Sequence, residues 1–257
     1  MTGTFHLGLT SDDLQGAELA IVPGDPGRVQ RIASALEGAR PLAAQREFTS
    51  WLGMAGSRPV VVCSSGIGGP SLSIAVEELA RLGVRTFIRV GTTGGIGPDV
   101  HTGDLVVPTA AVRLEGASHD FAPAAYPAVA DLECTIALRD AAEATGATVH
   151  VGVCASTDTF YPGQERYDTY SGRVPTRLRG SLEEWRGLGV LSFEMEAATL
   201  FTMCATQGLR SGAVLGVLAN RGVAETPEQE HIEAIEDIAI GAAVGAAAAL
   251  CRTPSQP

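Results

Sequence analysis

The chain has 257 residues, of which 18 are basic and 29 are acidic, so its formal charge at pH 7 is −11. Every basic residue is an arginine, and the absence of lysine excludes Schiff-base aldolases, pyridoxal-phosphate enzymes, Ser-Lys hydrolases and P-loop NTPases. The acidic balance argues against a nucleic-acid partner but not against a small anionic substrate, which local arginines can bind. Hydrophobic residues make up 45% of the chain, enough to bury a sizeable core.

Short β-branched runs alternate with longer helical patterns along the whole chain. The expected strands are Leu19–Val22, Pro59–Ser64, Thr86–Val90, Asp104–Val112, Val149–Ala155, Val190–Glu194 and Ala213–Leu218. The expected helices are Pro26–Leu36, Ser71–Leu82, Asp131–Thr145, Leu182–Leu188, Glu196–Gln207 and Pro227–Leu250. Several of the strands are continuously apolar, as strands covered on both faces are. The alternation predicts a single α/β domain over residues 1–257, a sandwich whose mixed central sheet is flanked by helices, with a disordered tail at 252–257.

The chain carries no targeting or membrane signal. Residues Met1–Asp13 lack the basic and apolar regions of a signal peptide. The longest apolar run, Ile238–Cys251, is shorter than the roughly 20 residues of a membrane span and predicts the buried face of a terminal helix. The five cysteines form no C-x-x-C pair, and four lie in apolar runs. We therefore expect buried, reduced thiols in a cytoplasmic protein with no membrane or nucleic-acid partner.

Two glycine-rich segments each follow a predicted strand and lead into a predicted helix. The first is Pro23–Arg28, and the second is Ser65–Ser71. Glycines let the backbone approach a ligand, and a helix N-terminus with an arginine such as Arg28 attracts anions. Each segment alone also fits an ordinary strand–turn–helix connection, because neither matches a P-loop or a dinucleotide-binding fingerprint.

The segment Arg89–Gly95 is interpreted as a third loop at a strand end. A charged Arg89 in a buried strand is costly unless it meets an anion or a carboxylate, so a phosphate site and a structural ion pair are both open. Glu194 and Glu196 follow another strand end and, two residues apart, point to one side of an extended segment. They fit the vicinal hydroxyls of a ribose, or the N-terminus of the next helix.

The stretch Phe160–Tyr167 combines an aromatic face, an amide and an arginine within a few residues. Phe160 can stack on a planar heterocycle, while Gln164 and Arg166 can read the carbonyl and N–H groups along its edge. A solvated loop with one packed aromatic side chain is the other interpretation. The polar stretch Pro162–Gly180, which overlaps it, predicts a long functional loop. No G-x-S-x-G motif or partnered histidine points to a covalent nucleophile.

Together, these segments resemble the bacterial uridine phosphorylases of the hexameric nucleoside phosphorylase superfamily, from Phe5 to about Arg221. The superfamily pattern S-x-G-I-G-x-P-S-x-S-I-x-x-x-E-L occupies residues 64–79 without deviation. The segments that match the uridine-specific members are Phe5–Leu9, Val22–Pro26, Asp158–Arg166 and Glu194–Glu196. The resemblance implies a three-layer α/β sandwich with a barrel-like central sheet.

The resemblance also implies a role for each residue at a matching position. The expected catalytic residues are Arg166, Gln164, Glu196 and Arg89. The expected phosphate ligands are Gly24, Arg28, Arg89 and Thr92, with Arg46 supplied by a neighbouring subunit. The expected nucleoside contacts are His6 from a neighbour, Thr92, Thr93, Gly94, Phe160, Gln164, Arg166, Glu194, Met195, Glu196 and Arg221. A structural K⁺ is expected at a subunit interface, at Glu47, Ile67 and Ser71.

The implied reaction is the reversible phosphorolysis of uridine to uracil and α-D-ribose 1-phosphate. Inorganic phosphate is the co-substrate, no organic cofactor is needed, and the expected assembly is a homohexamer, a trimer of dimers with shared active sites. A broader pyrimidine nucleoside phosphorylase and a non-catalytic nucleoside-binding relative are the alternatives. Residues Gly222–His231, Phe193 and Cys154 depart from the usual family residues. Arg221 stands where purine-specific members carry an acid, so purine nucleosides are expected to be poor substrates.

Overall fold

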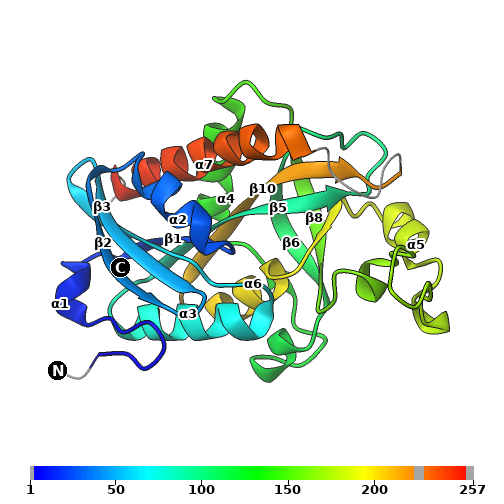
Figure 1. Cartoon of the computed structure of the whole chain (residues 1–257), viewed down its shortest axis with the longest axis horizontal. Coiled ribbons are helices and arrows are strands. Elements are labelled where there is room, and N and C mark those ends of the chain that lie inside the picture. The colour runs from blue at the N-terminus through cyan, green and yellow to red at the C-terminus, as the bar shows by residue number, and fades with distance from the viewer. Residues whose placement is uncertain (1–2, 223–228, 253–257) are drawn as a thin grey trace.

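The computed structural model describes residues 3–222 and 229–252, and one mixed sheet of ten strands runs through them (Figure 1). Five strands pair in a closed ring in the order β5, β10, β6, β8, β9 and back to β5. Their bounds are β5 Thr86–Gly95, β10 Arg210–Asn220, β6 Leu105–Leu114, β8 Val149–Thr157 and β9 Ser192–Glu194. The ring is the barrel-like part of the sheet that the sequence resemblance predicted.

The remaining strands extend the sheet outward from the ring. β1 pairs with β5 and with β4, both in parallel, and β3 and β2 continue the sheet with antiparallel pairing, while the short β7 pairs with β6. Their bounds are β1 Leu19–Pro23, β2 Glu37–Gln45, β3 Phe48–Ala55, β4 Arg58–Cys63 and β7 Ala128–Val129. Because β1, β4 and β5 are parallel, their carboxyl ends meet at one edge.

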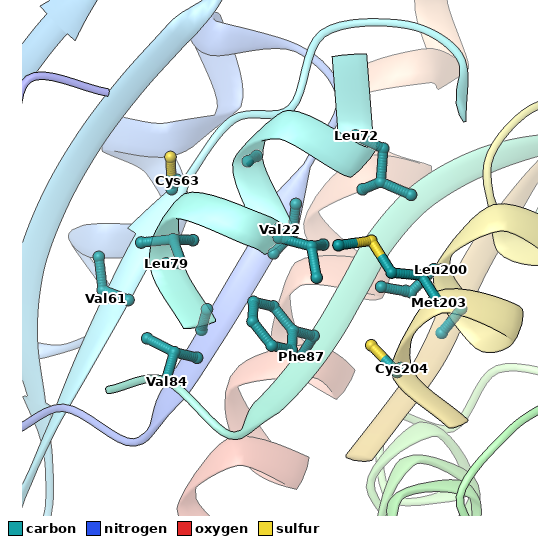
Figure 2. Packing of buried hydrophobic residues seen from close by; sticks show 14 of the residues in the cluster. Val22, Val61, Cys63, Leu72, Leu79, Val84, Phe87, Leu200, Met203 and Cys204 are labelled. Atoms are coloured by element: carbon teal, nitrogen blue, oxygen red, sulfur yellow. The ribbon is translucent and has the colours of Figure 1, made fainter. Parts of the chain in front are cut away.

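Helices cover both faces of this sheet. On one face lie α3 (Gly69–Arg81) and α6 (Ala197–Thr206), and on the other lie α2 (Pro26–Ala33), α4 (Leu132–Glu143) and α7 (Gln229–Arg252). Successive residues of β1 enter opposite cores: Ala20 and Val22 pack with α3 and α6, whereas Leu19 and Ile21 pack with α2 and α7. Figure 2 shows the first of these cores. The three-layer α/β sandwich is therefore confirmed.

The other described helices are short: α1 (Ser11–Leu14), α5 (Ser181–Gly187) and a 3₁₀ helix at Ala117–Asp120. The stretch Pro162–Gly180, which was predicted as a long loop, holds two short 3₁₀ turns, at Pro162–Gln164 and Thr176–Leu178. It lies beside α5 at one end of the molecule (Figure 1). The prediction of a long irregular segment is thus confirmed.

Every predicted strand and helix is present, with boundaries that shift by a few residues. The sequence analysis missed β2, β3, the short β7 and the short helix α1. β2 contains Pro41, is largely exposed, and pairs with β3 through two register shifts, so it lacks the regular alternation that signals a strand. The predicted start of the last helix at Pro227 and the tail beyond Arg252 lie outside the described residues.

The interpretation of Arg89–Gly95 as a loop was wrong. β5 continues to Gly95 and stays paired with β10 as far as Asn220. The glycines serve close packing instead of a turn, since a Cβ on Gly95 would lie 2.8 Å from Cγ1 of Val100. A bulge between Val217 and Ala219 in β10 keeps this end of the strand pair curved, which helps to close the ring.

The apolar run near the C-terminus forms part of α7. By length and composition alone His231–Arg252 could cross a membrane, although the apolar run Ile238–Cys251 by itself is too short to do so. Its apolar side lies in the core with α4 and β10, where Ala239, Ala243 and Ala247 are buried. This packing accounts for the apolar composition. Four of the five cysteines are also buried, as predicted, and burial raises the pKa of the Cys63 thiol to about 12.

Candidate active site

A cavity of about 640 Å³ opens at the edge where β1, β4 and β5 end. Open α/β sheets bind ligands at such edges, because the loops that follow parallel strands converge there. Its lining residues are Gly24, Asp25, Pro26, Arg28, Glu47, Gly66, Ile67, Ser71, Arg89, Gly91, Thr92, Thr93, Gly94, Phe160, Gln164, Arg166, Phe193, Glu194, Met195, Glu196, Leu218 and Ala219. The cavity thus gathers segments that are up to 195 residues apart, from Gly24 to Ala219.

The two glycine-rich segments lie against each other at the cavity floor. The Gly66 N–H donates to the Gly24 carbonyl oxygen at 2.9 Å. A Cβ on Gly24 would lie 3.3 Å from the Gly66 oxygen, a tight contact that a glycine avoids. Asp25 caps α2 by accepting the Gly27 N–H at 2.8 Å. The segments thus form one glycine-lined surface ahead of α2 and α3.

Arg89 lies at the centre of the cavity and is almost fully buried. Its Nη2 donates to Oε2 of Glu196, and its Nε lies 3.4 Å from Oε2 of Glu194. Its Nη1 is also buried and has no hydrogen-bond partner among the described residues. The structural ion pair is therefore present, and among the described residues neither Nη1 nor Nε has a hydrogen-bond acceptor.

Glu194 and Glu196 converge on the same arginine but have different surroundings. Glu194 accepts the Glu196 N–H at 2.9 Å and a hydrogen bond from the Ser156 hydroxyl, so it caps the start of α6. Burial raises the pKa of Glu194, against the opposing attraction of Arg89. Glu196 accepts the Gly68 N–H at 2.6 Å and faces the cavity. The interpretation as the N-terminus of a helix is therefore confirmed for Glu194, while the ribose interpretation stays a prediction for Glu196, which faces the cavity.

Phe160, Gln164 and Arg166 also line the cavity. The Arg166 guanidinium carbon lies 4.1 Å from the centre of the Phe160 ring, so one face of the ring carries the arginine. The Gln164 amide nitrogen donates to the Thr157 hydroxyl at 3.3 Å. The aromatic, the amide and the arginine are therefore brought together, as the sequence predicted.

Two neighbouring threonines of β5 differ in their hydrogen bonding. Both line the cavity with Gly94, but the Thr93 hydroxyl already donates to the Phe193 carbonyl oxygen at 2.6 Å. Within residues 3–222 and 229–252, no side-chain hydrogen bond involves Thr92. Thr92 is therefore better placed than Thr93 to donate a hydrogen bond to a ligand.

Three predicted site residues do not line the cavity of this chain. His6 binds Glu78, with 2.8 Å between Nδ1 and Oε1, and Arg46 is exposed on the turn between β2 and β3. Arg221 lies behind the cavity wall, where its Nη1 donates to the Gln164 carbonyl oxygen. A fourth residue, Arg28, lines the cavity but pairs with Glu236 of α7 at 2.7 Å.

The three residues expected at a cation site lie together at the cavity mouth. The Ser71 hydroxyl donates to Oε1 of Glu47 at 2.8 Å, and Ile67 is 77% exposed. A Cβ on Gly66 would come within 2.8 Å of Cγ of Glu47 and 2.9 Å of the Ser71 hydroxyl oxygen, so glycine allows both side chains to approach the backbone closely. The Glu47 backbone N–H, followed by Ser71, holds the pKa of the Glu47 carboxyl below its usual value.

Sequence reasoning missed the residues that hold the arginines and acids in place. Glu236 pairs with both Arg28 and Arg31, and Ser156 binds Glu194. Glu236 lies 205 residues from Arg31, and no local motif joins them. Ser156 is the next-to-last residue of β8, and a single serine at the end of a strand gives no sequence signal for a bond to a distant glutamate.

The chain matches known proteins over almost its full length. The model of the phosphorylase superfamily matches residues 18–253. A uridine phosphorylase of Escherichia coli strain K12 is 61% identical over 243 residues, which cover 95% of this chain and 96% of that protein. The uridine phosphorylase of Klebsiella aerogenes is 60% identical over the same shares. That of Haemophilus influenzae is 57% identical over 250 residues, 97% of this chain and 99% of its own.

Proposed function

The chain belongs to the phosphorylase superfamily, and from this membership we propose that it catalyses the reversible phosphorolysis of uridine. The observation that carries the proposal is the cavity, which unites the Arg89–Glu196 pair with the Gln164 and Arg166 wall. Phosphate and uridine enter, and uracil and α-D-ribose 1-phosphate leave. The broader pyrimidine activity and the non-catalytic relative are not favoured, since the matching relatives at 57–61% identity are uridine phosphorylases.

Phosphate binds at the glycine-lined end of the cavity. Arg89 offers the buried Nη1 donor, and Arg28 and the Thr92 hydroxyl line the same space. Guanidinium groups bind oxyanions through parallel N–H bonds, so two arginines can orient the dianion and offset its charge. Gly24 leaves the backbone open to its oxygens.

The ribose lies between phosphate and base. Glu196 has one carboxylate oxygen on Gly68 and the other on Arg89, and it faces the cavity beside Met195. A carboxylate that accepts from both the 2′- and 3′-hydroxyls fixes the sugar ring with C1′ towards phosphate. Holding the two reactants in line removes much of the entropic cost of a bimolecular step.

Uracil binds at the Phe160 end, with its polar edge on Gln164 and Arg166. As phosphate attacks C1′ through a transition state with oxocarbenium character, the N-glycosidic bond breaks and its electron pair leaves with uracil. Negative charge then develops on the uracil carbonyls. Donors that are already in position, the Gln164 amide and the Arg166 guanidinium, stabilise that charge, as an oxyanion hole does.

A neighbouring subunit supplies the residues that this chain's cavity lacks. We propose a homohexamer built as a trimer of dimers, in which Arg46 and His6 of one copy complete the phosphate and ribose sites of another. Both residues lie outside the cavity of their own chain, and Arg46 is exposed. Phe5, beside His6, is 81% exposed and apolar, as a subunit contact would be.

The same contact suits the expected monovalent cation. The Glu47 carboxylate, the Ser71 hydroxyl and the Ile67 main chain offer oxygen atoms beside Gly66, where Glu47 and Ser71 approach the backbone too closely for a Cβ. Oxygen donors are those that hard cations prefer. These residues fit K⁺, which would supply a structural charge between subunits. We further expect no organic cofactor and a cytoplasmic location.

The test is phosphate-dependent release of uracil from uridine. Purified chain is incubated with uridine, with and without inorganic phosphate, and uracil and ribose 1-phosphate are quantified. Equal amounts of both products, formed only with phosphate, are expected. Uracil released without phosphate would indicate hydrolysis, and no release in either case would contradict the proposed function.

A further inference from the structure

Glu165 stands between the two residues proposed to read uracil, yet its side chain points away from the cavity. Gln164 and Arg166 line the cavity, and Glu165 does not. Glu165 ends the 3₁₀ turn at Pro162–Gln164 with φ of 52°, in the left-handed region that glutamate seldom adopts. With this left-handed backbone conformation at Glu165, both neighbouring side chains line the cavity while its own side chain points away from it.

The buried Glu165 carboxylate holds the far end of the long loop. It accepts N–H groups from Gly180 at 2.5 Å and Leu182 at 2.8 Å, at the start of α5. The Tyr167 hydroxyl donates to it at 3.1 Å and the Ser181 hydroxyl lies at 3.4 Å. One carboxylate thus joins residue 165 to residues 180–182 and holds the two ends of the intervening loop together.

The charge state of Glu165 agrees with this anchoring. Burial alone would raise the pKa of the Glu165 carboxyl, but the Leu182 and Gly180 N–H groups and the hydroxyls outweigh it. The pKa therefore lies below its ordinary value, and the carboxylate is ionised at neutral pH. Hydrogen bonds to an ionised acceptor are stronger than bonds between neutral groups, so the contact between Glu165 and residues 180–182 is a strong one.

Other bonds fix the same turn from the opposite side. The Arg166 N–H donates to the Tyr161 carbonyl oxygen at 2.8 Å, and Arg221 donates to the carbonyl oxygen of Gln164. The backbone of the uracil-reading pair is thus held between Arg221 and the Glu165 anchor. A residue in a disfavoured conformation persists only where its surroundings over-determine it, and here they do.

We propose that Glu165 is the positioning residue of the uracil site, because its anchored carboxylate makes Gln164 and Arg166 face the cavity together. This inference rests on the proposed function. It assigns Glu165 no contact with substrate and no part in proton transfer. Its consequence is that loss of the anchor impairs the use of the base while the phosphate site, built on β1, β5 and α2, stays intact.

The experiment compares Glu165→Ala and Glu165→Gln with Glu184→Ala in the full chain. Glu184 is an exposed acid in the first turn of α5 with no side-chain bond among the described residues, so it controls for lost charge beside that helix. A misplacement of about 1 Å can cost roughly 100-fold in rate. We expect kcat/KM for uridine to fall about 100-fold in Glu165→Ala and about 10-fold in Glu165→Gln, with KM for phosphate within about twofold.

A double-mutant cycle with Arg166→Ala distinguishes positioning from general instability. If Glu165 acts through its neighbours, Glu165→Gln in the Arg166→Ala background should cost less than about threefold. Additive losses, or equal increases of KM for uridine and phosphate, would overturn the inference. A smaller fraction of folded protein would lower the apparent kcat and leave both KM values unchanged. A thermal melt of each variant measures that folded fraction.

The outcomes also separate this inference from the proposed function. If the parent chain does not phosphorolyse uridine, the proposed function itself is wrong. If the parent is active and Glu165→Gln matches it in kcat/KM for uridine, the positioning role alone is refuted. Should Glu165→Ala not fold, Glu165→Gln keeps the side-chain volume and still decides the question.

Discussion

Replacement of Arg89 by lysine keeps the charge of the cavity but removes the geometry that the guanidinium supplies. Arg89 bonds Glu196 through Nη2, its Nε lies 3.4 Å from Glu194, and its buried Nη1, which has no partner among the described residues, is the proposed donor to phosphate. A lysine has one nitrogen on a flexible stem and cannot meet two carboxylates and an anion at once. Activity should therefore fall although the net charge is unchanged.

The magnitude follows from the bonds that lysine loses. A hydrogen bond to a charged group contributes about 1.5–3 kcal/mol, and Arg89→Lys loses at least one of them. At 1.36 kcal/mol for each factor of ten, that loss corresponds to a fall of roughly 10- to 150-fold in kcat/KM for phosphate. The free energy of unfolding should decrease by a similar 1.5–3 kcal/mol, because Glu194 stays buried with fewer donors.

The assay measures initial rates of uracil release across phosphate concentrations, with urea unfolding of the same samples. Arg139→Lys is the matched control, since Arg139 is exposed and bonds only its neighbour Asp140 among the described residues. The control should match the parent in both measurements. An unchanged KM and kcat for phosphate in Arg89→Lys would refute the argument and leave arginine at this position without a geometric reason.

Further outcomes test the base site and its supports. Arg166→Ala should lower kcat/KM for uridine by about 100-fold, as loss of one oxyanion donor does, and near-normal kinetics would remove it from the mechanism. Inosine should be a poor substrate because Arg221 binds the Gln164 backbone where an acid would be needed; turnover equal to uridine would refute this. Ser156→Ala should lower the free energy of unfolding by about 1–3 kcal/mol, since buried Glu194 loses a donor; an unchanged urea midpoint would contradict it. The depressed pKa of Glu165 gives stability that is present above about pH 4.3 and lost as pH falls through the folded pKa. The Tm difference between the parent and Glu165→Gln should therefore shrink below about pH 4, and a constant difference would contradict the assignment.

The sequence predicted the layers of the fold because most strands carry a strong apolar signal. β1 alternates between two cores and is buried along its length, so both the run and its burial were readable. β2 has an exposed edge and a proline, and its pairing depends on β3 alone. The glycine-rich half of β5 was wrongly interpreted as a loop, because glycine occurs both in turns and where chains pack closely. The contact between Gly95 and Val100 shows close packing, and the sequence alone does not reveal that contact.

For the site, the sequence identified most residues of the cavity but none of their mutual bonds. Gln164 and Arg166 were predicted from their chemistry, whereas the role of Glu165 depends on amides 15 to 17 residues away. Arg28 was predicted as a phosphate ligand, and its pairing with Glu236 depends on how α7 folds back over α2. Such contacts between distant segments carry no periodicity or motif.

On the proposed function, the two sequence interpretations of Arg89, a phosphate ligand and a structural ion pair, describe two states of one network. A buried guanidinium needs a counter-charge whenever phosphate is absent, and Glu196 supplies it. On the proposed function, a bound dianion takes over part of that charge, and Glu196 then has an oxygen for the ribose hydroxyls. Phosphate and uridine should therefore each bind more tightly when the other is present. Phosphate releases Glu196 from Arg89, and the ribose hydroxyls then supply the hydrogen bonds that Glu196 has lost. On this account, Arg89 and Glu196 together couple the binding of phosphate to the binding of uridine.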